Sequence, residues 1–445
     1  MNLFRAPAFA ASACAALACC PASAALPPEP LQELIGTGAD WSLHAQATYI
    51  DQYHGSFPAA YDGPNSFTSR AETEHTFSFS LYLGRKLWGG FEVFCDPEVF
   101  QGHGLSQTLG IAGFPNGEAV KSGYDSPHLN VSRLFIRKVI GLGGPREKVE
   151  EAANQFGGEE DVNRLVLSAG TFSADDFFDD NPYSHDPRTQ FMNWAMWESA
   201  AWDYPADIVG FTAGAVAEWN MPDSEWRLGV FMEPHEANGL RLDPHVDKAH
   251  SEVLQYDRRY TMGGLSGTVR TFLYWSEANM GSYAAAATQA APEDISLTRA
   301  YRSKAGVGVS WDQQLADGLG CFVRLSWNDG HAESFTFTEI DESVAAGLAL
   351  GGKAWGRSGD TAGVAVAADG ISSGHRHYLG EGGTGLILGD GALAYAPEEI
   401  LEAYYAFQAT RWLQLGPDVQ YIRNPGYNSA RGPVPVFALR AHVEF

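Results

Sequence analysis

Apolar and polar residues alternate one by one in many short stretches of the chain. The stretch HTFSFSLYL (75–83) places phenylalanine or leucine at every second position, and FVRLSWN (322–328) and ILEAYYAFQ (400–408) repeat the pattern. The C-terminal stretch PVFALRAHVEF (435–445) continues it to an aromatic last residue, Phe445. A period of two indicates β-strands that have one apolar face and one polar face.

The pattern predicts about sixteen such strands. Their approximate ranges are 41–53, 73–84, 87–95, 130–140, 163–172, 208–220, 225–233, 251–260, 265–276, 302–313, 321–328, 343–351, 361–369, 398–409, 411–422 and 434–445. The connections alternate between short ones, such as MPDS (221–224) and TMGG (261–264), and long ones, such as 173–207 and 370–397.

Alternation alone fits either a β-sandwich with a buried apolar face or a membrane barrel with its apolar face on lipid. The alternation of short and long connections favours the barrel, because outer-membrane barrels have short periplasmic turns and long extracellular loops. We therefore predict an all-β fold, a transmembrane antiparallel β-barrel with both termini on the periplasmic side. The last strand must pair with the first, because an open sheet edge is not tolerated in lipid.

One connection departs from this rule. The segment 141–162 lies on the short-turn side, yet it is 22 residues long by its own numbering. Its central sequence REKVEEAANQF (146–156) lies between glycine pairs and predicts a short helix, with a role as a periplasmic cap.

The N-terminus has the features of a secretory signal peptide. Arg5 precedes an apolar run from Ala6 to Cys20, and an A-x-A cleavage site follows at Ala22–Ala24. The predicted organisation is a signal peptide at 1–24, a proline-rich lead-in at 25–40 and the barrel at 41–445. Cys95 and Cys321 then remain, and both are expected to be small apolar residues within strands.

Net charge excludes one class of partner. The chain has 29 basic and 54 acidic residues and a formal charge of −25, which argues against a nucleic-acid partner because phosphate contacts need basic patches. Aromatic residues make up 12% of the chain, and it contains 49 glycines, which suits an exported all-β protein.

Several long motifs resemble the carbohydrate-selective porins of the OprB type. They are DDFFDDNPYSHDPRTQFMNWAMWESAAWDYPAD (175–207), RRYTMGGLSGTVRTFLYW (258–275), YLGEGGTGLILGDGALAYAPEEILEAYYAF (378–407) and NPGYNSARGPVPVFALRAHVEF (424–445). The resemblance implies a sixteen-stranded outer-membrane barrel that passes monosaccharides and similar small polar solutes by facilitated diffusion, without a cofactor. It also suggests that Phe445 is the residue presented to the barrel insertion machinery, and it leaves monomer and homotrimer open.

The segment 173–207 is the first candidate for the sugar path, because it mixes acids, an arginine and aromatic rings. Carboxylates and guanidinium groups bind sugar hydroxyls, and aromatic rings pack against sugar C–H faces. The candidate residues are Asp179, Asp180, Asp186, Arg188, Trp194, Trp202 and Tyr204. The alternative is a loop whose aromatics pack on themselves and whose acids lie in solvent.

Charged residues on the polar faces of strands form the second candidate set. By parity the following residues point into the lumen: Arg133, Arg137, Arg270, Arg324, Arg440, Glu92, Glu218 and Glu402. Opposed charges across a constriction orient water and polar solutes, whereas charges at the barrel rims only pair with each other. Both interpretations stay open for each residue.

Signals for an enzyme or a metal site are weak. GEGGTG (380–385) matches G-x-G-x-x-G but lacks a βαβ context, and His375 and His377 have no further ligand at a metal-like spacing. The acids of 175–186 could bind calcium, but the EF-hand spacing is absent. We expect no enzyme, no cofactor and no metal. The alternatives to a sugar porin are a general acid-rich diffusion porin, a secreted soluble glycan-binding β-protein and an outer-membrane enzyme.

Overall fold

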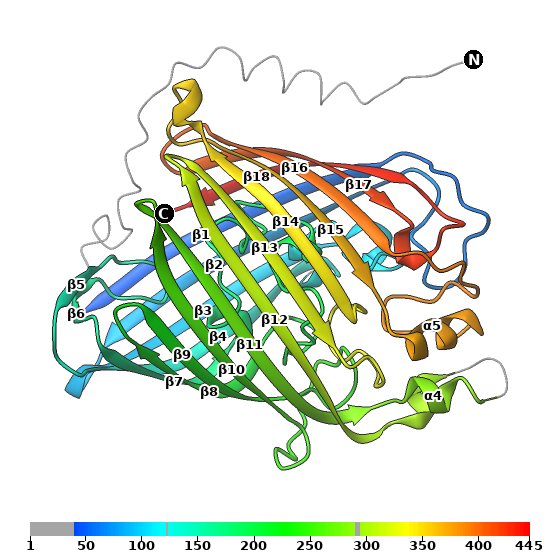
Figure 1. The fold of residues 1–445 in the computed structure, drawn as a ribbon, viewed down its shortest axis with the longest axis horizontal. Coiled ribbons are helices and arrows are strands. Elements are labelled where there is room, and N and C mark those ends of the chain that lie inside the picture. The colour runs from blue at the N-terminus through cyan, green and yellow to red at the C-terminus, as the bar shows by residue number, and fades with distance from the viewer. Residues whose placement is uncertain (1–39, 122, 290–293) are drawn as a thin grey trace.

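The structure is a computed structural model that describes residues 40–121, 123–289 and 294–445. The predicted signal peptide and residues 25–39 of the predicted lead-in lie outside the described residues. A closed barrel dominates the fold (Figure 1). Its sixteen strands are β1 (Trp41–His54), β2 (Glu72–Lys86), β3 (Phe91–Gly102), β4 (Tyr124–Gly141), β7 (Arg164–Phe172), β8 (Thr212–Asn220), β9 (Ser224–Met232), β10 (His250–Met262), β11 (Leu265–Met280), β12 (Ala300–Ala316), β13 (Leu319–Asn328), β14 (Glu342–Gly351), β15 (Thr361–Gly370), β16 (Glu398–Gln408), β17 (Leu413–Arg423) and β18 (Val434–Glu444).

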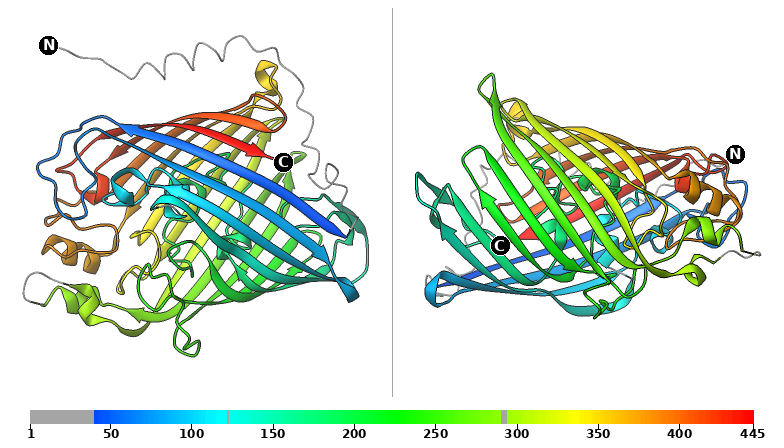
Figure 2. Two further views of the ribbon diagram at one scale, coloured as in Figure 1. Left: turned by 180° about the vertical axis from the view of Figure 1, so that it is seen from behind. Right: turned by 60° about the horizontal axis from the view of Figure 1, so that its bottom comes forward.

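The last strand closes the barrel against the first. β18 pairs with β1 in antiparallel register from Gln46↔Glu444 to His54↔Val436, and the two strands run side by side in Figure 2 (left). Backbone hydrogen bonds between Ala45 and Phe445 extend the pairing, at 2.9 and 3.1 Å. Every barrel strand is therefore paired on both sides, and the predicted sixteen-stranded antiparallel barrel is confirmed.

Alternate side chains separate an apolar outer face from a more polar lumen. The outward-facing side chains are 44–52% exposed at five apolar positions, which are Leu134, Leu228, Leu325, Val366 and Leu439. Exposed tryptophans lie near the short turns, at Trp41, Trp88, Trp219, Trp226, Trp355 and Trp412, and Trp275, Tyr301 and Trp327 lie near the long loops. Two aromatic rims flanking an apolar band are typical of outer-membrane barrels.

Two strand boundaries differ from the prediction for local reasons. β3 starts at Phe91 and not at 87, because Gly89 and Gly90 adopt positive φ and form the preceding turn. β8 starts at Thr212 and not at 208, because the Asp207 carboxylate accepts the backbone N–H groups of Val209 and Phe211 in a turn.

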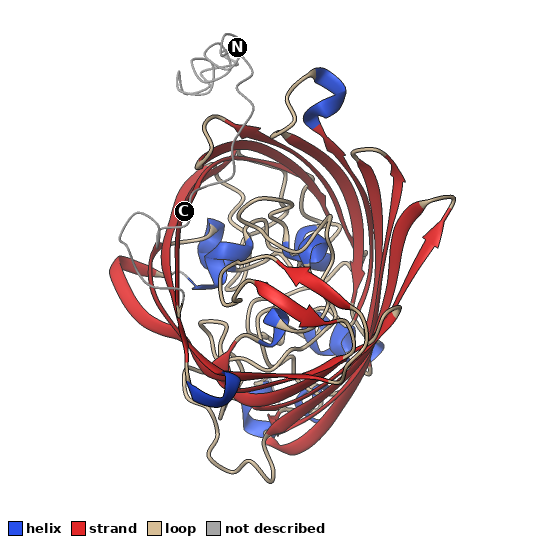
Figure 3. Ribbon diagram, turned by 90° about the vertical axis from the view of Figure 1, so that its left-hand side faces the viewer, coloured by secondary structure: helices blue, strands red, loops and turns tan. Residues whose placement is uncertain are grey.

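The helix predicted within 141–162 is wrong. The segment forms a hairpin of β5 (Arg146–Val149) and β6 (Gly158–Asp161), which lies across the short-turn opening of the barrel (Figure 3). Cross-strand pairs of opposite charge, such as Lys148↔Glu159, favour the hairpin. Phe156 packs on Phe94 in the mouth with ring centroids 5.6 Å apart, a contact within the barrel that fixes the hairpin there.

Long loops extend into the barrel from the other end (Figure 3), and the short helices α4 and α5 lie at that end beyond the strands (Figure 1). The helices are α3 (Trp194–Trp197), α4 (Tyr283–Ala286) and α5 (Ser373–Gly380). The long loops also contain 3₁₀ turns at Leu105–Thr108, Gly117–Lys121, Ala174–Asp176, Ile295–Thr298 and Pro425–Tyr427, and the short turns contain two, at Trp88–Gly90 and Gly352–Trp355. None of the helices in the described part of the chain is long and apolar enough to cross a bilayer. The β7–β8 loop, residues 173–211, supplies much of the aromatic core inside the barrel.

The two faces of β15 give a test of the barrel in lipid. Val366→Arg places a charge on the outer face, where the side chain is 52% exposed, and we expect a loss of stability of about 2–4 kcal/mol if the site lies near mid-membrane. Thr361→Arg, on the same strand but lining a lumen cavity, serves as the matched control. The measurement is urea unfolding of both variants in vesicles, and equal stability of the two would contradict the assignment of the faces.

Candidate functional site

Arginines on the barrel wall fix the β7–β8 loop inside the lumen. Arg324 is 1% exposed and donates to the backbone oxygens of Ser184 (2.5 Å), Met196 (2.9 Å) and Asp179 (2.9 Å), and its Nε lies 3.3 Å from the Asp179 carboxylate. Arg440 donates to the backbone oxygens of Pro187 (2.7 Å) and Gln190 (2.8 Å). These two predicted lumen residues therefore anchor the loop.

Carboxylates complete the attachment of the loop. Glu402 on β16 is fully buried and accepts the backbone N–H groups of Met192 (2.5 Å) and Asn193 (3.1 Å). Lys304 on β12 pairs with Asp203 of the loop at 2.8 Å, and both side chains are nearly inaccessible to solvent. The loop thus forms part of the lumen wall.

A cavity of about 190 Å³ lies between this loop and the β3–β4 loop, and we call it the loop chamber. Trp194, Trp197 and Tyr204 line it on one side, and Trp194 and Trp197 meet edge to face with ring centroids 4.7 Å apart. The indole N–H groups of Trp194 and Trp197 have no hydrogen-bond acceptor among the described residues. A side chain at Gly117 would collide with the Trp197 indole nitrogen, so the glycine lets the β3–β4 loop approach this ring closely.

Charged groups line the remainder of the loop chamber. Arg188 Nε lies 3.1 Å from Glu118, and Arg188 Nη2 lies 3.5 Å from Glu98. Burial tends to raise the pKa of Asp186, but the Arg188 and His442 charges and the Arg188 backbone N–H outweigh it, so this pKa lies below its usual value. The chamber therefore presents fixed charges of both signs beside its aromatic wall.

One ion pair borders two cavities. Arg133 on β4 donates through Nε to Asp176 Oδ2 at 2.7 Å, and its guanidinium lies 3.9 Å from Asp96. Arg133 and Asp176 both line the loop chamber and also a second cavity of about 360 Å³ on its periplasmic side. We call this second cavity the periplasmic chamber, and the Arg133–Asp176 pair marks the junction of the two.

Several more of the charged strand residues that the sequence analysis singled out lie in or beside the periplasmic chamber. Arg137 and Glu218 line it, with Arg137 3.9 Å from Glu92 and Glu218 3.6 Å from Arg227. The apex of the β5–β6 hairpin borders the chamber through Ala153, Asn154 and Gln155. Its cross-section is therefore shaped by the hairpin that the sequence did not predict.

The other predicted residues lie outside both chambers. Arg270 pairs with Asp312, and its Nη2 lies 3.9 Å from Asp180. Trp202 is 1% exposed and packs on Phe272 with centroids 4.9 Å apart, so it belongs to the packed interior of the loop. A third lumen cavity of about 380 Å³ lies across the loop, beside Tyr183, Thr361 and Tyr404.

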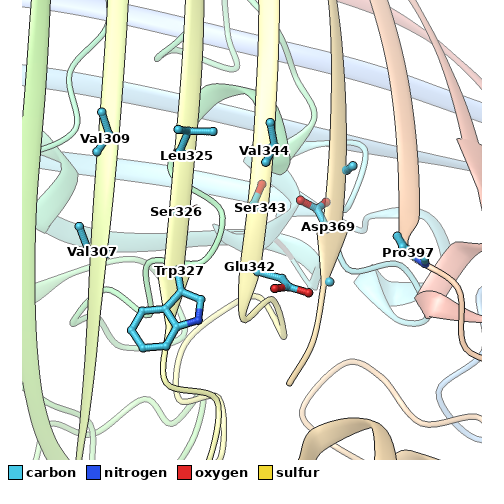
Figure 4. A pocket seen from close by; sticks show the side chains of 12 residues that line it. Val307, Val309, Leu325, Ser326, Trp327, Glu342, Ser343, Val344, Asp369 and Pro397 are labelled. Carbon is cyan, nitrogen blue, oxygen red and sulfur yellow. The ribbon is translucent and has the colours of Figure 1, made fainter. Parts of the chain in front are cut away.

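Another cavity is on the outside of the barrel. Val307, Val309, Leu325, Trp327 and Val344 line a groove of about 460 Å³ across β12–β14, and their side chains point away from the lumen (Figure 4). Because these residues belong to the apolar outer band, the groove is not part of a polar solute path. No group of three or more His, Cys, Asp or Glu residues in the described ranges is arranged to hold a metal ion.

Sequence reasoning did not single out several residues of the two chambers. Asp176 stands in the same acidic run as Asp179, but only the fold shows that it faces Arg133. Glu118 and Gly117 belong to a loop without a motif, and Ser168 and Tyr82 are ordinary alternating strand residues. For Ser168 and Tyr82, the alternation of inward and outward positions along β7 and β2 was the signal that could have identified them as lumen residues.

A comparison with protein families decides the identity of the chain. The sequence profile of the family described as "Carbohydrate-selective porin, OprB family" matches residues 65–445. The chain belongs to this family. The porin is therefore a channel of the Gram-negative outer membrane for carbohydrates.

Solved structures share the fold of the porin. The high-pH structure of Pseudomonas putida OprB matches with a TM-score of 0.68 and 18% identity, covering 93% of this chain and 96% of that one. Its low-pH structure matches with a TM-score of 0.50 and 15% identity, covering 93% and 95%. The structural match to this protein shows a common fold. A comparison with curated protein sequences gives no significant match.

The junction of the chambers generates a prediction about ion selectivity. Arg133→Ala together with Arg137→Ala removes two lumen cations and leaves Asp176, Asp96 and Glu92 without them, so we expect a stronger preference for cations. Arg133→Lys, which keeps the charge, should leave the preference close to that of the wild type. The measurement is the reversal potential across a salt gradient, and an unchanged value in the double variant would show that these arginines do not border the ion path.

Proposed function

We propose that the porin passes neutral monosaccharides by facilitated diffusion through the loop chamber, past the Arg133–Asp176 pair and into the periplasmic chamber. The observation that carries this proposal is the aromatic wall of the loop chamber, to which Trp194 and Trp197 belong, together with their buried indole N–H groups, which lack an acceptor among the described residues. A buried donor without a partner is costly, so a sugar hydroxyl is a fitting acceptor. The aromatic rings offer faces for sugar C–H groups.

The charges of the path support a neutral solute. Arg133 and Arg188 face Asp176, Glu118 and Glu98 at short range, so each cation is balanced by carboxylates. The carboxylates repel an anionic sugar and the guanidinium groups repel a cationic solute. The hydroxyls of a neutral sugar, in contrast, can form hydrogen bonds with both groups. We expect weak ion selectivity that leans toward cations at low salt and fades as salt rises, because salt screens the exposed acids of the outer loops.

A general diffusion porin without sugar preference is the second candidate. The formal charge of −25 favours it, because a strongly acidic surface attracts cations regardless of any sugar site. The two candidates differ in whether sugar flux saturates. A secreted soluble glycan-binding protein is no longer an alternative, given the closed barrel and the family.

Sugar block of single channels tests the proposed function. Glucose added on the extracellular side should reduce the wild-type current in a saturable way. Trp197→Phe keeps an aromatic ring, although a smaller one, and removes the N–H, so it should raise the half-saturating glucose concentration about fivefold, the loss of one ordinary hydrogen bond. The absence of saturable block in the wild type would favour the general diffusion porin.

Trp202→Phe is the matched control, because Trp202 comes from the same loop, also has an indole N–H without an acceptor in the described structure, and lines neither chamber. It should leave the glucose block unchanged. An equal effect of both variants would mean that the loop as a whole was perturbed. The proposed hydrogen bond between Trp197 and the sugar would then have no support.

The last residue is proposed to serve barrel assembly and not transport. Phe445 stacks on Trp412 with ring centroids 6.0 Å apart, in the aromatic group near the short turns, which keeps it away from the lumen. Phe445→Asp should lower the amount of heat-modifiable barrel in the outer membrane, while channels that do assemble keep the wild-type glucose block. Normal assembly of this variant would contradict the role of Phe445 toward the insertion machinery.

A further inference from the structure

The periplasmic chamber has the size and the lining of a binding site in its own right. Its volume of about 360 Å³ falls within the ~300–1,000 Å³ range of small-molecule pockets. Phe135, Phe177 and Tyr82 contribute aromatic surface, and Arg137 and Glu218 contribute one charge of each sign. It is separated from the loop chamber by the Arg133–Asp176 pair, which lines both.

Two polar atoms at this chamber lack partners within the protein. Ser168 on β7 is 3% exposed, and its hydroxyl makes no hydrogen bond to any described residue. The same holds for Asn154 Oδ1 at the apex of the hairpin. Ser168 supplies a donor and an acceptor, and Asn154 Oδ1 supplies an acceptor. Buried polar atoms of this kind normally find a partner, so a polar ligand or ordered water completes them.

The hairpin apex is built to form the floor of the chamber. Ala152 and Gln155 exchange two backbone hydrogen bonds of 3.0 and 3.1 Å around a tight turn, with Asn154 at a φ of 60°. Asn154 Nδ2 donates to Asp96 Oδ2 at 2.7 Å, which ties the turn to β3. Lys86 Nζ lies 4.7 Å above the Phe156 ring, and Glu151 lies 3.6 Å from His44, so β1 and β2 also hold it.

Asp96 connects this floor to the junction above. Its carboxylate accepts from Asn154 and lies 3.9 Å from Arg133, which in turn binds Asp176 of the β7–β8 loop. The β7–β8 loop on one side of the periplasmic chamber and the hairpin apex on the other are therefore joined through Arg133 and Asp96, which lie on neighbouring strands of the wall.

We propose that the periplasmic chamber is a second sugar-binding site, which holds one neutral monosaccharide after it has passed the Arg133–Asp176 pair, with the turn Ala152–Gln155 as its floor. The inference rests on the proposed function, since it assigns a second station to the same path. A neutral polyol fits because its hydroxyls bind Ser168, Asn154, Arg137 and Glu218, while its C–H face packs on Phe135 or Phe177. A ligand with a net charge would be repelled by the side chain of the same sign, either Arg137 or Glu218.

The test uses glucose block of single channels of the full-length mature barrel, with glucose added to one side at a time. Ser168→Ala removes only the hydroxyl without a partner. It should raise the half-saturating concentration for periplasmic glucose about fivefold, the loss of one hydrogen bond, and leave the value for extracellular glucose nearly unchanged. Ser251→Ala, which removes a buried serine hydroxyl on β10 away from the chamber, is the matched control and should change neither value.

A second variant tests the floor. Asn154→Gly keeps the backbone conformation, because glycine adopts positive φ readily, but it removes the bond to Asp96. The dwell time of periplasmic glucose should shorten several-fold in this variant. An unchanged dwell time would overturn the role of the turn.

The two proposals fail in different ways. If wild-type channels show no saturable glucose block from either side, the proposed function itself is wrong. If extracellular glucose blocks and responds to Trp197→Phe, but periplasmic block does not respond to Ser168→Ala, only the second site is overturned. If Ser168→Ala and Ser251→Ala have the same effect, the change reflects a general disturbance of the barrel wall and not the loss of a binding contact. This outcome also overturns the second sugar-binding site.

Discussion

One constraint governs the whole fold: where lipid surrounds the barrel wall, every backbone N–H and C=O group must have a hydrogen-bond partner within the protein. An N–H or C=O group left unpaired in hydrocarbon costs several kcal/mol, so only a closed ring of strands is stable there. The β1–β18 pairing supplies that closure, and all sixteen strands then have neighbours on both sides. The same closure creates a lumen that is sheltered from lipid, in which loops with irregular backbone can be held by side chains from the wall.

Several charged residues of the lumen hold the interior together, and others line the chambers. Arg324 and Arg440 satisfy backbone carbonyls of the β7–β8 loop, and Glu402 satisfies two of its N–H groups. Such charge-assisted bonds to the backbone fix the loop more tightly than contacts between exposed side chains. Arg133 and Arg188 line the chambers, each beside carboxylates, so the walls of these cavities carry charges of both signs although the chain is acidic.

The sequence predicted the barrel well because alternation is a local property of each strand, and the motif of 173–207 pointed to the segment that fills much of the lumen. The alternation also placed Arg137 and Glu218 on the lumen side of their strands. It could not distinguish an arginine that anchors a loop, such as Arg324, from one that lines a cavity, such as Arg133, because that depends on which loop atoms meet the wall. The hairpin at 146–161 was missed because its glutamates and alanines favour a helix locally, and the contacts of Phe156 and Asn154 with distant strands decide its form.

The attachment of Arg440 links the closure of the wall to the packing of the interior. Arg440 lies on β18, the strand that completes the ring, and it donates hydrogen bonds to the β7–β8 loop at Pro187 and Gln190. Its buried guanidinium has these carbonyl partners only when the loop lies inside the lumen, because a closed wall with the loop outside would leave the charge without them. The stability of the last strand in the wall therefore depends on the loop that fills the barrel.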